Sequence, residues 1–226
     1  TIFQDSNLSL LKILIGLYVF FNSNNGVNGN QLANYVDANV KTARKFSKKC
    51  RILMAESNNS KILQSSFYEI DILEIGGHHK GKRGKDSENK QPTLLILSTL
   101  EDNNYPQYVK LHTLPNYKGE PIEEYLKEKC LFDPTIVINC DRDKAFFCLN
   151  KLAQLENSVV DYTKENHKLK WLNTFIGNIQ SNINHLYRLV KKRDLPLFLS
   201  EQEWRINHRY SGKRIMDKVK KYISMS

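Results

Sequence analysis

The stretch FYEIDILEIGG, residues 67–77, decides how the rest of the chain is read. Phe67 to Ile75 alternates in the manner of a strand, with Glu69 and Asp71 on one face and Ile70 on the other. Two glycines end the strand. A charged side chain in the middle of an apolar strand costs free energy unless it is paired or bound to a cation. Asp71 is therefore the first candidate functional residue, with a salt bridge as its alternative role.

The chain from this strand onward reads as a mixed sheet with helices packed on it. Three strands come first, followed by helix, strand, helix, strand and helix, which is the order expected of a ribonuclease-H-like core. The sequence thus predicts an α/β fold class with a mixed sheet, although strand order does not by itself identify a function. The predicted strands are 67–75, 93–100, 108–114, 135–141 and 158–162, and the predicted helices are 120–129, 144–152, 169–190, 197–208 and 213–223.

The chain before residue 67 reads as helical. A short helix at 31–36, a break at Asp37 and a strongly basic helix at 40–54 follow an apolar helix at 8–21. Short helix, tight turn and basic helix form the outline of a helix-turn-helix, with a plain helical hairpin as the alternative. The charge of the second helix favours DNA binding. We therefore predict a helix-turn-helix domain at 1–55, a polar linker at 56–66 and a ribonuclease-H-like catalytic domain with C-terminal helices at 67–226.

The charge of the chain indicates a polyanionic partner. Among 226 residues there are 34 Lys or Arg and 24 Asp or Glu, a net charge of +10 near neutral pH. Because the basic residues are gathered into clusters, we favour a track for a phosphate backbone over solvated surface charge. No apolar run reaches the ~18 residues that a spanning helix needs, so we expect no membrane association. The clusters are 41–51, 80–85, 188–193 and 205–221.

The four cysteines show no metal-site spacing and are typical of reduced, buried thiols in a cytosolic protein. We therefore expect a cytoplasmic protein that is associated with the nucleoid when bound to DNA, or a nuclear one if the host is a eukaryote.

A second carboxylate and a polar helix face complete the candidate site. Asp141 ends the predicted strand 135–141, and two acidic groups on neighbouring strands can converge on one divalent cation. The alternative for this region is helix capping, for which Asp143 is placed. The predicted helix 169–190 carries an uncharged polar stripe that includes Asn178, whose carbonyl oxygen could reach a metal. Hydrogen bonding between helix and sheet is the equally open alternative for this stripe.

At these residues the chain resembles insertion-sequence transposases of the ISXO-like group, which is related to the Merlin elements. The block YEIDILEIGGHHKGKRGK, residues 68–85, resembles the family's signature around its first catalytic Asp. The block TIVINCDRDKAFFCL, residues 135–149, resembles the region of the second. The segments NIQSNIN and LVKKRDLPLFLSEQEWRINHR, within residues 178–209, resemble the region of the third residue and a trailing E-F-x-x-R-x-N-R-R motif.

The resemblance implies a catalytic triad of two aspartates and one asparagine, Asp71, Asp141 and Asn178. It implies that these residues hold Mg²⁺, with Mn²⁺ as the other candidate cofactor. The chain departs from the family pattern at Ile72, which replaces an acidic residue, and at Gln202, which replaces an aromatic one. It begins at Thr1, so we expect a preceding segment, which in this family is a zinc ribbon. These departures leave open a domesticated or inactive copy.

The implied activity is metal-dependent DNA strand cleavage and strand transfer at the ends of an insertion sequence. The implied partners are double-stranded DNA, namely the terminal inverted repeats and the target, and further copies of the chain in a homodimer or larger synaptic assembly. Alternatives are a ribonuclease-H-like nuclease, a catalytically inactive DNA-binding protein and, less favoured, an RNA-binding protein. The residues predicted to bind DNA are Lys41, Arg44, Lys45, Lys48, Lys49, His78, His79, Lys80, Lys82, Arg83, Lys85, Lys191, Lys192, Arg193, Arg205 and Arg209.

Overall fold

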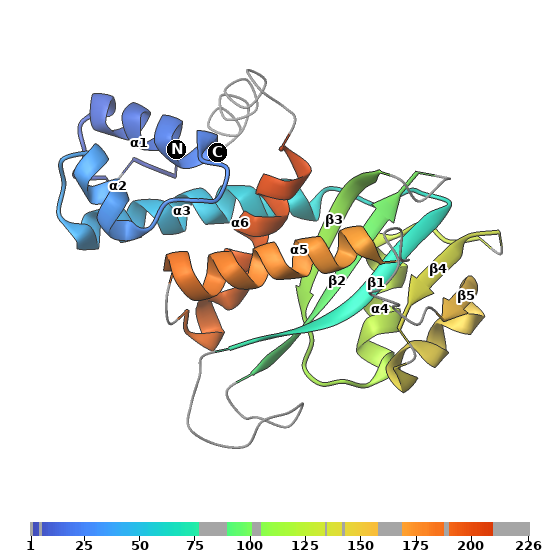
Figure 1. The fold of residues 1–226 in the computed structure, drawn as a ribbon. Coiled ribbons are helices and arrows are strands. Elements are labelled where there is room, and N and C mark those ends of the chain that lie inside the picture. Colours follow the sequence, from blue (N-terminus) through green and yellow to red (C-terminus); the bar gives the residue numbers. More distant parts are fainter. Residues whose placement is uncertain are drawn as a thin grey trace.

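The structure of the protein, a computed structural model, is a central sheet with helices on both faces and a helical extension at one side (Figure 1). No helix within the described part of the chain is both long enough and apolar enough to cross a membrane. All four cysteines are free thiols, three of them buried. The structure describes residues 2–4, 6–76, 90–100, 105–133, 135–141, 143–157, 169–187 and 190–209.

The sheet has the ribonuclease-H-like arrangement that the sequence predicts. Its strand order is β3-β2-β1-β4-β5, in which β2 is antiparallel to both of its neighbours, β1 and β3, while β4 is parallel to β1 and β5 is parallel to β4. The last strand lies a few residues before its predicted position, and the predicted range 158–162 falls outside the described residues. The strands are β1 (Phe67–Ile75), β2 (Gln91–Thr99), β3 (Pro106–Thr113), β4 (Val137–Cys140) and β5 (Gln154–Asn157).

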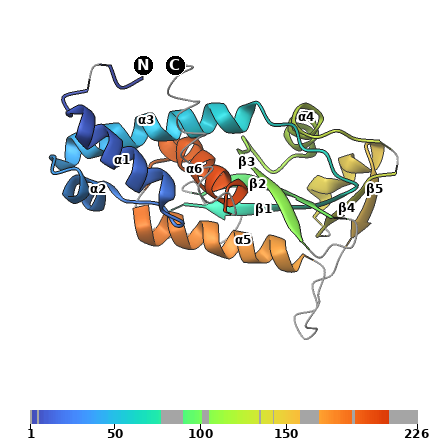
Figure 2. The ribbon, with the colours of Figure 1, turned by 90° about the horizontal axis from the view of Figure 1, so that it is seen from above.

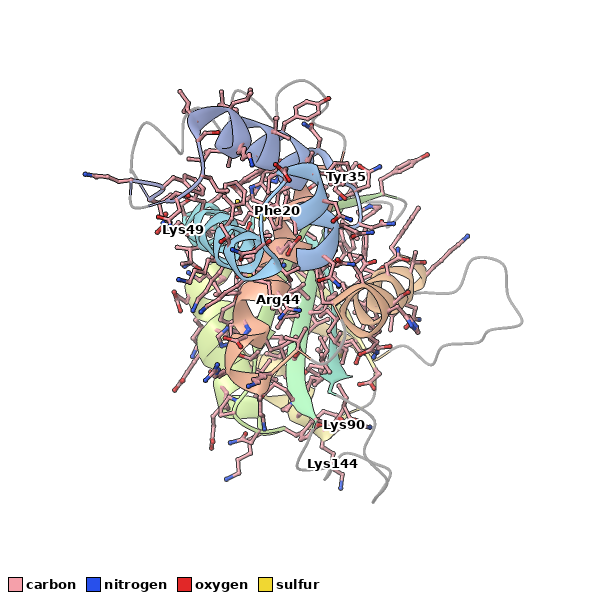
Figure 3. All side chains as sticks on the ribbon, turned by 90° about the vertical axis from the view of Figure 1, so that its left-hand side faces the viewer. Phe20, Tyr35, Arg44, Lys49, Lys90 and Lys144 are labelled. Atoms are coloured by element: carbon pink, nitrogen blue, oxygen red, sulfur yellow. The ribbon has the colours of Figure 1, made fainter. Side chains whose placement is uncertain are left out.

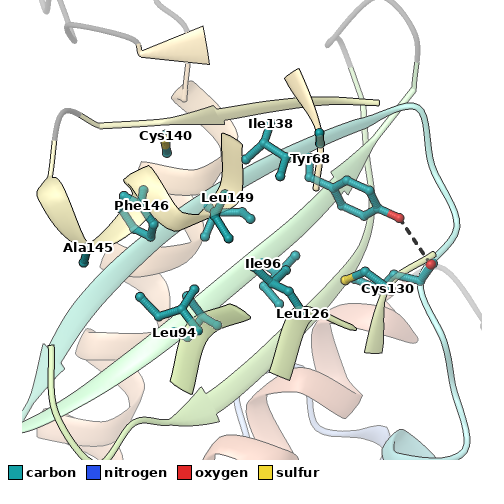
Figure 4. Packing of buried hydrophobic residues seen from close by; sticks show 14 of the residues in the cluster. Tyr68, Leu94, Ile96, Leu126, Cys130, Ile138, Cys140, Ala145, Phe146 and Leu149 are labelled. Atoms are coloured by element: carbon teal, nitrogen blue, oxygen red, sulfur yellow. Dashed lines mark hydrogen bonds between the residues drawn. The ribbon is translucent and has the colours of Figure 1, made fainter. Parts of the chain in front are cut away.

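Alternation along β1 divides the apolar side chains between the two faces of the sheet. Tyr68 and Ile70 belong to a core with α4 (Gly119–Lys129) and the 3₁₀-helix η1 (Lys144–Lys151), shown in Figure 4. Leu73 belongs to the core on the opposite face of the sheet, which is covered by the helices of the C-terminal part of the chain (Figure 2). These are α5 (Lys170–Ser181), its continuation as the π-helix η2 (Asn182–Tyr187), the 3₁₀-helix η3 (Lys192–Asp194) and α6 (Leu195–Asn207).

The helical extension consists of α1 (Leu10–Asn22), α2 (Gly29–Tyr35) and α3 (Val40–Asn59). Both helices of the helix-turn-helix outline begin at asparagine caps. The Asn28 side chain accepts from the first turn of α2 in a capping box, and the Asn39 side chain accepts from the first turn of α3. Asp37 makes the turn between them with a φ of 45°. Helix α3 continues to Asn59, inside the segment predicted as a linker.

Helix α6 joins the extension to the sheet through a buried ionic cluster. The Glu201 carboxylate accepts from Arg51 Nε of α3 at 2.7 Å, from Arg205 Nη2 at 2.6 Å and from the Tyr187 hydroxyl at 2.6 Å. Arg205 also donates to the carbonyl oxygen of Phe20. Arg205 is thus only 6% exposed. This corrects the prediction that it binds DNA, because a guanidinium in this cluster has no access to a phosphate.

The same helix covers the open edge of the sheet. Asn207 both donates to the Val109 carbonyl and accepts from the Val109 N–H, while Glu203 accepts from the Leu111 N–H. Strand β3 thereby has partners for backbone groups that an edge strand leaves exposed. The trailing motif of the sequence, Glu201 to Arg209, thus has structural roles at Glu201, Arg205 and Asn207.

Substitution at Gly26 tests how closely this junction is packed. A Cβ atom at Gly26 would lie 1.9 Å from the Tyr187 hydroxyl oxygen, and the residue has a φ of +99°. We expect Gly26→Ala to lower the free energy of unfolding by about 2 kcal/mol or more, because both the clash and the backbone strain oppose it. Urea denaturation measures the difference.

Gly177→Ala is the matched control, because a Cβ there meets nothing within 4 Å in the interior of α5. It should raise the free energy of unfolding by up to about 1 kcal/mol. Equal stability of the Gly26→Ala variant and the unmodified protein would contradict the packing described for this junction.

Candidate active site

The pairing of β1 with β4 brings Asp71 and Asp141 together. In the parallel register Glu69 lies beside Asn139 and Ile70 beside Cys140, where β4 ends, and continuing this register by one residue brings Asp141 next to Asp71. Neighbouring strands are about 4.8 Å apart. Both carboxylates act on the Cys140 thiol, which belongs to the core on the opposite face: burial first, then Asp141 and then Asp71, raise the pKa of Cys140 to about 12. Two half-buried carboxylates, distant in sequence, therefore share one point on the sheet.

The backbone after β4 holds the second carboxylate in place. Asp141 Oδ1 accepts from the Asp143 N–H at 2.9 Å, which fixes the turn that follows the strand. Asp143 Oδ1 accepts from the Ala145 N–H at 3.0 Å and caps η1. The alternative considered for Asp143, a helix cap, is thus confirmed, and Asp141 is the residue that lies next to Asp71.

Glu69 is a buried carboxyl group below this pair, and the sequence pattern gave no role to it. It is 2% exposed and lies on the same face of β1 as Asp71. Its Oε2 accepts from the Leu172 N–H in the first turn of α5 at 3.2 Å. Burial raises the pKa of Glu69 to about 7, against which the Leu172 hydrogen bond acts. Its lateral neighbour Asn139 has a buried Oδ1 without a hydrogen-bond partner, to which a protonated Glu69 could donate.

Two contacts set how α5 lies along β1. The Leu172 backbone N–H places the start of the helix over Glu69, and the Gln180 side chain, whose Nε2 donates to the Glu74 carbonyl at 3.5 Å, shows which side of the helix faces β1. Asn173 is seven residues from Gln180, so the two lie within about 20° of each other around the helix axis. Asn173 therefore lies on the same side of α5 as Gln180, the side that faces β1. The Asn173 side-chain nitrogen is buried and has no hydrogen-bond partner.

Asn178, the third residue of the predicted triad, lies on another side of the helix. It is five residues from Asn173, which turns it by about 140° around the axis. It is exposed, and Asn182 on the same stripe donates to Gln202 of α6 at 2.9 Å. The stripe that contains Asn178 thus faces α6 and the surface rather than β1. A polar stripe in a helical sequence does not reveal which side of the helix the sheet covers, so the sequence pattern did not single out Asn173.

The donor set fits a hard divalent cation bound by few protein ligands. Asp71 and Asp141 supply carboxylate oxygens, which such cations prefer. Asn173, on the side of α5 that faces β1, carries an amide group whose oxygen is a neutral ligand of the same kind. Within the described ranges, no group of three or more His, Cys, Asp or Glu side chains is placed to hold a metal ion. A cation here would therefore depend on the aspartate pair together with neutral or substrate oxygens.

Comparison with known proteins identifies the family. The model of the ISXO2-like transposase domain matches residues 67–207, which contain the whole sheet and both aspartates. The chain belongs to the ISXO2-like transposase family. No curated protein matches the transposase.

Among solved structures, the transposase is similar to the Mos1 transposase paired-end complex with the left transposon end. The identity is 10% and the TM-score 0.34, over 91% of this chain and 77% of that chain. It is also similar to the Mos1 strand transfer complex, with 10% identity and a TM-score of 0.33, over 92% of this chain and 76% of that chain.

Apart from the buried Arg205, the basic residues predicted to bind DNA fall into three groups in the transposase. Those of the loop 78–85 lie outside the described residues. Two others have intramolecular contacts: the Lys49 ammonium lies 5.9 Å from the centroid of the Phe3 ring, and Arg209 donates to the carbonyl oxygens of Pro106 and Ile206. The exposed ones are Lys41, Arg44, Lys45, Lys48, Lys191, Lys192 and Arg193.

The raised pKa of Glu69 predicts a specific pH dependence of stability. The ordinary pKa of a glutamate is 4.5, and that of Glu69 in the folded protein is about 7. Between these two pH values Glu69 is ionised in the unfolded chain and protonated in the folded protein. The free energy of unfolding should therefore fall as the pH rises through this window, by up to about 3 kcal/mol. Urea denaturation in EDTA at several pH values between 4.5 and 8 measures this slope.

The control is Glu69→Gln, which keeps the shape of the side chain and cannot ionise. Its pH dependence should be flatter than that of the unmodified transposase by the amount attributed to Glu69. Identical pH profiles for the two proteins would show that Glu69 ionises normally in the folded state.

Proposed function

We propose that the transposase cleaves DNA strands at the ends of its insertion sequence and joins them to a target, by phosphodiester hydrolysis and transesterification. The observation that carries the proposal is the parallel pairing of the two neighbouring strands β1 and β4, whose register, continued by one residue, brings Asp71 and Asp141 together. The membership of the family supports the same reaction class.

The chain's own groups would divide the work as follows. Asp71 and Asp141 bring two negative charges to one point and bind a divalent cation, Mg²⁺ or Mn²⁺. When bound, such a cation polarises the scissile phosphate and lowers the pKa of the attacking water or 3′-hydroxyl. The Asp143 N–H orients Asp141, and Glu69 holds the start of α5 against β1. A neutral third ligand leaves more of the coordination sphere to phosphate oxygens.

For the third ligand we propose Asn173 in place of Asn178. The unpartnered, buried amide of Asn173 lies on the stripe of α5 that faces β1, whereas Asn178 is exposed on the stripe that leads to α6. Buried amide groups without partners are rare and call for a ligand or an explanation. Asn178 then serves as a matched control on the same helix.

The DNA partner would be bound by the exposed basic residues of the extension and of the C-terminal segment. Because two ends must be cut and joined to one target, we propose that the active form contains at least two protomers.

Substitution at the site provides the test. We expect Asp71→Asn and Asp141→Asn each to lower the rate of strand cleavage and joining with Mg²⁺ by about 100-fold or more, since each removes a charged metal ligand. Asn173→Ala should lower the rate markedly, and Asn178→Ala should leave it within a few-fold. The assay follows labelled DNA that carries the flanks of the element, with cleaved and joined products resolved on gels.

Each other outcome has a definite meaning. Full activity in either aspartate variant would reject the mechanism. Loss of activity in Asn178→Ala but not in Asn173→Ala would restore Asn178 as the third ligand. Cleavage without any joined product would identify a nuclease, and DNA binding without cleavage would identify a non-catalytic descendant of a transposase.

A further inference from the structure

A basic cleft lies between the two helices of the helix-turn-helix, α2 and α3, and the C-terminal part of the catalytic region. It has a volume of about 1190 Å³ and is lined by α2 and α3 on one side and by η2, η3 and the start of α6 on the other. Figure 3 shows Arg44 at this junction, below α2 and beside α3, while Lys49 of the same helix lies to another side. Two basic clusters that are about 140 residues apart in the sequence therefore border one hollow.

The charge of the cleft is strongly positive. Among the lining residues that the structure describes, seven are Lys or Arg and one is acidic, Asp194, which is 3.5 Å from Arg193. Within the described part of the chain, no ion pair involves the four exposed cations of α3, so their charge is available to a ligand. The cations of the α3 wall are Lys41, Arg44, Lys45 and Lys48, those of the opposite wall are Lys191 and Arg193, and Arg51 lies between the walls.

The two walls are fixed relative to each other by the buried cluster at α6. Arg51 of α3 donates to Glu201, and its guanidinium carbon lies 3.9 Å from the centroid of the Phe198 ring. Tyr187, at the end of η2, is bound to the same Glu201. On the other side, the Arg44 stem packs against Gly29, where a Cβ would come within 2.7 Å of it. The cleft is thus a preformed feature of the fold.

The chemistry of the lining favours the sugar–phosphate backbone of a duplex. From Lys41 to Lys48 the helix rises about 10 Å, which corresponds to about three phosphates of one strand at 3.4 Å per step. The aromatic residues of the lining, Tyr187 and Phe198, pack against each other and against Arg51. Neither of these two rings is therefore free for the base stacking that single-strand sites use.

We propose that the two walls hold one and the same backbone segment of double-stranded DNA, clamped between α3 and the η2–η3 segment. This deepens the proposed function, on which it rests, by making the helix-turn-helix and the catalytic region a single DNA-binding surface. The alternative is that α3 and the C-terminal cluster bind separate duplex segments on independent surfaces.

A short duplex distinguishes these arrangements. The probe is a fluorescein-labelled 12-base-pair duplex of arbitrary sequence, titrated in EDTA and followed by fluorescence anisotropy at several salt concentrations. One variant combines Lys41→Glu with Lys45→Glu, and the other combines Lys191→Glu with Arg193→Glu. The control combines Lys118→Glu with Lys151→Glu, two exposed lysines beside α4 and in η1, and changes the net charge by the same amount.

If one backbone occupies both walls, reversing either wall removes contacts that every bound duplex makes. Each wall variant should then bind on the order of tenfold more weakly, with a salt slope reduced by about 2, while the control changes far less. If the walls are independent sites, losing one leaves the other intact, and binding falls only about twofold. That result, or a wall variant that binds like the control, would overturn the proposal.

Two further measurements complete the design. A 12-nucleotide single strand should bind more weakly than the duplex, and tighter binding of the single strand would overturn the assignment to a duplex. Thermal unfolding should be unchanged in all variants because the substituted side chains are exposed. Since the titration needs neither metal nor cleavage, its failure removes the clamp alone, and failure of the cleavage assay removes the catalytic proposal alone.

Discussion

The parallel pairing of β1 with β4 is the contact on which the proposed active site depends. It places Asp71 beside Asp141, and it also places Glu69 beside Asn139 one layer deeper on the same face. Two adjacent carboxylates repel each other unless a cation or a proton is shared between them. The apolar cores on the two faces of the sheet hold the strands in this register. The free energy gained by packing the whole domain therefore offsets the repulsion between the two carboxylates.

A second constraint links this site to the rest of the molecule. Glu201 binds Arg51 of α3, Arg205 of α6 and Tyr187 of η2, which brings the helical extension, the C-terminal helix and the end of the α5–η2 helix to one buried point. Separating one partner from such a buried cluster leaves an uncompensated charge and is strongly unfavourable. The cluster is therefore expected to hold α3, α6 and η2 in fixed positions relative to one another. DNA held by α3 would therefore have a set position relative to the aspartate pair.

The sequence allowed much of the fold to be predicted, because alternation and glycine mark β1 and capping residues mark α2 and α3. The predicted bounds of β1 are those observed, 67–75. Other features depend on tertiary contacts that local patterns do not contain. The burial of Arg205 follows from its contacts with Glu201 and with Phe20 of α1, and the proposed preference for Asn173 over Asn178 follows from which side of α5 the sheet covers. Neither could be derived from spacing along the chain.

The central claim, that Asp71 and Asp141 form one divalent-cation site, is tested most directly by isothermal titration of Mn²⁺ into the protein without DNA. The account predicts binding that is lost in Asp71→Asn and equally in Asp141→Asn, while the folding of both variants, measured by circular dichroism, is retained. Unchanged Mn²⁺ binding in either variant would contradict it.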